Sequence, residues 1–220
     1  MQKSPEQDPQ SKLQTPHMAA IAGIIFAILL AISIILIGIA RPSKTNDWVP
    51  TPIWMFALNI VPLTGIAFLW FMGVVRSQIG QYEDRFFATV FLGSGLLFLA
   101  MLFAAAAMAG SFEVISGPAA PALMSLDKKI TSTMMNVYAM KMAAVFMIST
   151  STILLRTGVL PRWLAYAGFV LALINLLTTT RWELTFLLFP LWVLLLSVVI
   201  LVKNLHNNTK RRTNTNHPQC

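Results

Sequence analysis

The residue with the clearest chemical potential is a lysine inside an otherwise apolar segment. Residues 134–155, MMNVYAMKMAAVFMISTSTILL, are apolar enough to cross a membrane, and they carry Lys141 away from either end. An ionisable side chain at membrane depth is energetically costly, which makes it a candidate functional residue. Tyr138 lies three residues earlier, on the same face of a helix. Lys141, Tyr138 and Asn59 of an earlier segment therefore form a candidate binding site for an anionic or polar solute.

The sequence leaves two structural roles open for Lys141 beside solute binding. Its long stem can extend toward the outer membrane surface, because Cβ bonds tilt toward the N-terminus of a helix. It can also form an ion pair, and the candidate counter-charges are Glu113 and Glu183. Glu183 has a second explanation, since Thr180 and Glu183 have the spacing of a capping box. A retinal-type Schiff base is disfavoured because there is neither a seventh helix nor a deep acidic counter-ion.

Other kinds of active site lack their residues inside the apolar segments. The three histidines, His17, His206 and His217, lie outside these segments or at their edges, which excludes haem ligation and a histidine metal site at membrane depth. A serine–histidine dyad is excluded for the same reason. No acid lies deep in a segment, and the lone cysteine is Cys220. We therefore predict no catalytic residue, no metal site and no cofactor, and an enzyme acting at a membrane interface is the least favoured class.

The composition is typical of an integral membrane protein. Hydrophobic residues make up 56% of the chain and charged residues only 11%, whereas a soluble domain has about 25% charged residues. The net charge of +8 comes from the tails and short loops. No basic face is interleaved with aromatic residues, so nucleic acid is not a predicted partner. The predicted partners are the lipid bilayer and either another membrane protein or a second copy of this chain.

Six apolar segments predict an all-α integral membrane bundle of six transmembrane helices. They cover residues 18–40, 52–75, 86–109, 134–155, 162–177 and 182–203. Together they form one membrane domain at 15–205. The tails at 1–14 and 206–220 are polar and are predicted to be disordered.

The fourth helix is predicted to be longer than its membrane-crossing part. It can begin at Pro121 and continue to Thr157, with Gly158 as its C-terminal cap. The third and fourth helices should then form a hairpin that projects beyond the outer membrane surface. In the second helix, Pro62 predicts a kink near Asn59.

The distribution of basic residues predicts that both termini are cytoplasmic. Six crossings place the two tails on the same side, and cytoplasmic segments carry an excess of lysine and arginine. That side has Lys3, Lys12, Arg76, Arg85, Arg156, Arg162, Lys203, Lys210, Arg211 and Arg212, and the other side has Arg41, Lys44, Lys128, Lys129 and Arg181.

Two segments carry a resemblance to a known group of proteins. EDRFFATVFLGSGLLF, residues 83–98, and RTGVLPRWLAYAG, residues 156–168, resemble uncharacterised bacterial multi-pass membrane proteins that contain domains of unknown function. The resemblance implies a bacterial origin and a compact helical bundle in the cytoplasmic membrane. It implies no activity and no catalytic or binding residue.

The leading functional hypothesis is a non-enzymatic accessory or interaction component of the membrane. The alternative is a small-solute or ion transporter that uses Lys141 as a cationic site. Transport predicts a polar cavity that water can reach around Lys141, Tyr138 and Asn59. An accessory protein predicts a dry bundle with a large apolar lateral face.

Overall fold

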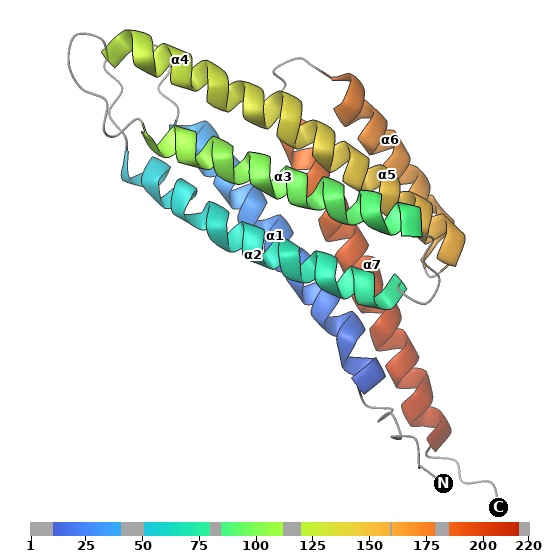
Figure 1. Cartoon of the computed structure of the whole chain (residues 1–220). Helices are drawn as coiled ribbons and strands as arrows, with labels where there is room; N and C mark the ends of the chain where they lie inside the picture. The colour runs from blue at the N-terminus through green and yellow to red at the C-terminus, as the bar shows by residue number, and fades with distance from the viewer. Residues whose placement is uncertain are drawn as a thin grey trace, which may run out of the picture.

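A computed structural model describes residues 11–40, 51–79, 85–111, 120–158, 160–178 and 185–215, which are almost entirely helical. The elements are α1 (Ser11–Ala40), α2 (Pro52–Ile79), α3 (Arg85–Ser111), α4 (Ala120–Thr133), the π-helix η2 (Met134–Ala139), α5 (Met140–Thr157), α6 (Arg162–Leu177) and α7 (Thr185–Thr215). No strand occurs within these ranges, which confirms the predicted all-α fold (Figure 1). Five helical segments are long and apolar enough to cross a membrane, and α6 is shorter.

Several predicted helix boundaries agree with the structure, and the two tails need a correction. The segment α6 covers residues 162–177, and Gly158 ends α5 with a positive φ of 61°. However, α1 begins at Ser11 and α7 continues to Thr215, so residues 11–14 and 206–215 are helical rather than disordered. Neither extension contains a proline or glycine to stop it, and adding residues to an existing helix costs far less than starting one.

The helices form a closed ring. Helix α1 packs against α2 and α7, and the ring continues through α2–α3, α3–α5, α5–α6 and α6–α7 contacts. The start of α1 and the end of α7 lie at the same end of the bundle (Figure 1). Helix α4 extends beyond the ring and packs against α3, as expected for the predicted hairpin. The residues that join α3 to α4 lie outside the described ranges.

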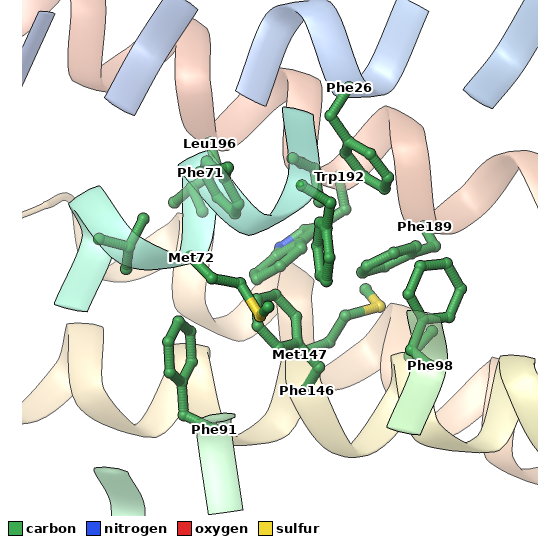
Figure 2. Packing of buried hydrophobic residues seen from close by; sticks show 14 of the residues in the cluster. Phe26, Phe71, Met72, Phe91, Phe98, Phe146, Met147, Phe189, Trp192 and Leu196 are labelled. Carbon is green, nitrogen blue, oxygen red and sulfur yellow. The ribbon is translucent and has the colours of Figure 1, made fainter. Parts of the chain in front are cut away.

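The centre of the ring is filled by phenylalanine side chains from five helices. Phe68 of α2 lies with its ring centroid 4.6 Å from Phe26, 5.4 Å from Phe98, 5.1 Å from Phe146 and 5.9 Å from Phe189. All five side chains are completely buried. Figure 2 shows their neighbours converging from α1, α2, α3, α5 and α7. Because lipid is as apolar as the core, close packing rather than water exclusion must hold these helices together.

A π-helical turn separates α4 from α5. Each extra residue in a helix rotates everything after it by about 100°, so η2 changes the direction in which the side chains of α5 point. The amide of Asn136 donates to the carbonyl of Ser132 at 2.6 Å and to its Oγ at 2.9 Å. These bonds use acceptors at the point where the regular hydrogen-bond ladder is interrupted.

Helices α5, α6 and α7 approach one another closely at Gly168. In the run from Ser149 to Thr152, three of the four hydroxyl groups donate to carbonyls of their own helix. The hydroxyl of Ser151 does not, and it lies beside Gly168 together with Nε1 of Trp192. A methyl group at Gly168 would lie 2.1 Å from Ser151 Oγ and 2.8 Å from Trp192 Nε1. Only glycine fits this contact without displacing its neighbours.

We expect Gly168→Ala to lower the free energy of unfolding by about 1–3 kcal/mol, the usual cost of overpacking a rigid core. The matched control is Gly93→Ala, because an added methyl group there has no heavy atom within 4 Å. That control should stabilise α3 by up to about 1 kcal/mol. Unfolding in detergent, followed by circular dichroism, measures both variants. Equal stability changes in the two variants would contradict the close packing at Gly168.

Candidate functional site

Helix α6 ends within the thickness of the bundle. Its 16 residues span about 24 Å at 1.5 Å per residue, less than the roughly 30 Å of a hydrocarbon core. The chain leaves the helix at Thr178, which is extended, and the Thr178 amide donates to the Ile174 carbonyl at 2.9 Å. The carbonyls that follow Ile174 have no donor within the helix. In a membrane such groups need partners from the protein.

Lys141 supplies those partners. Its ammonium group donates to the carbonyl of Leu176, and it also lies 3.4 Å from the carbonyl of Asn175 and 3.5 Å from that of Thr178. The three oxygens are at the negative end of the α6 dipole, where a cation is favoured. Lysine has three N–H donors and no acceptor, which suits a group of carbonyls. The side chain is therefore a C-terminal cap supplied by a neighbouring helix.

The geometry of this cap depends on local structure in α5. Lys141 is the second residue of α5, two positions after Ala139, the last residue of the π-helical turn. Helix α5 runs antiparallel to α6 (Figure 1), so its beginning lies beside the end of α6. The additional residue of the π-turn changes the rotation of α5 relative to α4, and in the resulting orientation Lys141 reaches α6.

The other candidate residues have separate environments. Tyr138, in η2, is 55% exposed. Asn59 lies on the exposed side of α2 and donates its amide to the Met55 carbonyl of its own helix at 2.9 Å. Within the described part of the chain, no hydrogen bond joins Lys141 to either of them. The candidate counter-charges Glu113 and Glu183 lie outside the described residues.

Asn175 is a polar residue beside Lys141 whose importance was not evident from the sequence. Its side chain is 1% exposed, and neither its amide nitrogen nor its amide oxygen has a hydrogen-bond partner. A buried amide without partners costs free energy. The only sequence signal was an asparagine near the end of a short apolar helix, which is equally compatible with an exposed position.

The described residues form an all-α bundle with five helical segments long and apolar enough to cross a membrane, and a lysine within one of these segments caps the short helix α6. No group of three or more metal-ligating side chains occurs in the residues that the structure describes. No family model matches the chain, and neither a curated protein nor a solved structure matches it.

Replacing the capping lysine should destabilise the end of α6. Lys141→Met keeps the apolar stem but leaves the carbonyls of α6 without a donor. We expect the free energy of unfolding to fall by about 1–2 kcal/mol. Hydrogen–deuterium exchange should also become faster at the Thr178 amide, which closes the last turn of α6.

The matched control for this substitution is Lys129→Met, on the exposed face of α4. It removes the same charge without touching α6, so it should leave both measurements unchanged. If Lys141→Met leaves exchange at Thr178 unchanged, the cap does not hold the end of α6.

A second substitution tests the environment of Asn175. Asn175→Leu removes two buried polar atoms that lack partners and keeps a similar volume. We expect the free energy of unfolding to rise by about 1 kcal/mol, measured by denaturation in detergent. Asn175→Asp, which puts a charge at the same place, should lower it. A lower stability for Asn175→Leu would mean that the amide makes hydrogen bonds in the membrane.

Proposed function

We propose that the chain is an accessory protein of the bacterial cytoplasmic membrane that acts by lateral association and has no catalytic chemistry of its own. The observation that carries this proposal is the aromatic filling of the helix ring. A solute path between the helices would pass the rings of Phe68, Phe146 and Phe189, which are completely buried and lie within about 6 Å of one another. Such a centre suits a rigid membrane component.

The position of Lys141 supports the same proposal. A transport site needs a cation that can exchange one anionic partner for another. Here the ammonium group is directed to the carbonyls of α6. Releasing it would leave those carbonyls without donors in an apolar environment. The lysine is thus better suited to holding a helix end than to binding a solute.

The outward face of α1 is the surface that suits a partner in the membrane. Six isoleucines lie on it at alternating intervals of four and three residues, and each is at least 40% exposed: Ile21, Ile25, Ile28, Ile32, Ile35 and Ile39. Branched side chains are stiff, so they lose little conformational freedom when another helix packs on them. A second copy of this chain or another membrane protein is the proposed partner.

The proposed orientation follows the basic residues. Arg156 and Arg162 flank the turn between α5 and α6, on the side of the bundle that also holds the start of α1 and the end of α7. The guanidinium of Arg156 lies 4.3 Å from the centre of the Phe87 ring. Basic residues concentrate on the cytoplasmic side of membrane proteins, so we assign this side to the cytoplasm.

Transport remains the second candidate because of one observation. Asn175, whose backbone carbonyl lies 3.4 Å from the Lys141 ammonium group, has a buried side-chain amide without a partner. In a transporter this amide would bind the solute beside the ammonium group. The two functions therefore differ in whether small polar molecules reach this position.

Cysteine labelling separates the two functions. In a Cys220→Ser background, single cysteines at Ser151 and Asn175 report on the ring interior, and a cysteine at Ser125 reports on an exposed position of α4. Each is treated in membrane vesicles of both orientations with a small charged thiosulfonate reagent. We expect labelling at position 125 and none at positions 151 and 175, because a charged reagent cannot enter a dry bundle.

Rapid labelling at position 175 from either side would contradict the accessory role and favour transport. Denaturing the labelled samples and repeating the reaction provides the control, since the two buried cysteines must then react fully.

A further inference from the structure

A buried carboxylate lies at the end of the bundle that α4 extends. Asp127 is the only acidic residue within the described ranges, and its side chain is just 5% exposed. It contacts Ser111 at the end of α3, the helix against which α4 packs. Fourteen residues separate it from Lys141 along the chain, a distance of about 21 Å on a helix. This position is therefore distinct from the cap of α6.

The carboxylate is only partly satisfied by hydrogen bonds. Its Oδ2 lies 3.2 Å from Oγ of Ser111, whose single hydrogen has a second acceptor in the Met108 carbonyl at 2.7 Å. The other oxygen, Oδ1, is buried without a partner. Thr131 lies one helical turn further on the same face of α4, and its Oγ1 is also buried without a partner. Asp127 and Thr131 thus present, on one face of α4, two buried oxygen atoms that lack donors.

The electrostatic environment of Asp127 favours a positive partner. Ser111 is the last residue of α3, so Asp127 faces the negative end of that helix and carbonyls without donors in the helix. The neighbouring Lys128 and Lys129 are exposed. No ion pair between Asp127 and a basic residue occurs in the described part of the chain. A buried negative charge beside a helix C-terminus is unfavourable without a counter-charge.

We propose that Asp127, Thr131 and Ser111 bind a small monovalent metal cation of the sodium type. Carboxylate, hydroxyl and carbonyl oxygens are the ligands that hard cations prefer. A single carboxylate matches one positive charge, whereas calcium sites commonly combine several carboxylates. Ser111 is exposed and leaves an approach from water, while Asp127 and Thr131 supply the buried oxygens. The bound ion fixes α4 to the end of α3.

This site stands independently of the proposed accessory function. It involves none of the residues that fill the ring or cap α6, and a cation here crosses no membrane. Sodium binding to Asp127 therefore agrees equally well with an accessory protein and with a transporter.

The experiment uses the purified full-length protein in detergent. Binding of ²²Na⁺ is measured directly, and thermal unfolding is compared in sodium chloride and choline chloride at equal ionic strength. We expect one sodium ion per chain. The unfolding midpoint should rise by about 3–6 °C when sodium is at ten times its dissociation constant.

Two variants and one control locate the ion. Asp127→Asn removes the charge with little change in shape and should abolish ²²Na⁺ binding and the sodium-dependent shift. Thr131→Val removes one oxygen and should weaken sodium binding several-fold, so it tests the site even if Asp127→Asn fails to fold. Ser125→Ala, on the exposed face of α4, should bind sodium as the wild type does.

Three results would overturn the proposal. The first is a wild-type protein that binds no ²²Na⁺ and unfolds at the same temperature in both salts. The second is stabilisation by acid alone, which would mean that the carboxyl group holds a proton in place of a metal ion. The third is undiminished sodium binding by both Asp127→Asn and Thr131→Val.

Discussion

The structure depends on how the end of α6 obtains hydrogen-bond donors. A helix of 16 residues is too short to carry its last carbonyls into water on the far side of a membrane. These carbonyls need donors within the protein, and Lys141 is the side chain that reaches them. The ammonium group and the helix end would each cost free energy alone in an apolar environment. Their hydrogen bonds to each other lower both costs. The direction of Lys141 depends in turn on the π-turn and on the bonds from Asn136 to Ser132.

The rest of the bundle is held by the fit of side chains. Large rings fill the centre, while glycines let neighbouring helices approach closely. Gly23 receives the hydroxyl of Ser197, and Gly168 receives that of Ser151. In both cases the serine hydroxyl has no hydrogen-bond partner. At each contact the helices therefore pack closely although the serine hydroxyl lacks a hydrogen bond. Close packing is the main source of helix association in lipid.

Local sequence signals predicted the local features of the fold. The helical class, the limits of α6 and the cap at Gly158 follow from apolar length and from turn chemistry. The same reasoning identified Lys141 as unusual, because a charge inside an apolar segment is visible without a structure. Its partner was not predictable, since contact with the end of α6 depends on the register between two antiparallel helices. A uniformly apolar sequence contains little information on that register.

Two other features lay beyond sequence reasoning for related reasons. A π-turn has no residue signature that distinguishes MMNVYA from ordinary α-helix, so the direction of Lys141 could not be derived. Asp127 is followed directly by two lysines, Lys128 and Lys129, a pattern that predicts a solvated position. Its burial arises from the packing of α4 against α3, which a helix-by-helix reading does not include. The sequence therefore did not predict the environment of polar residues that lie where two helices pack together.

The π-turn also affects how the continuous helix that contains it contacts its neighbours. Helix α4, the π-turn η2 and helix α5 form one continuous helical segment from Ala120 to Thr157, and different parts of this segment have different neighbours. Asp127, near the start of the segment, must face α3, and Lys141, near its middle, must face α6. A straight α-helix fixes the angle between two such positions by their spacing alone. The wider turn changes that angle. It thereby allows a single continuous helix to direct one side chain toward α3 and another toward α6.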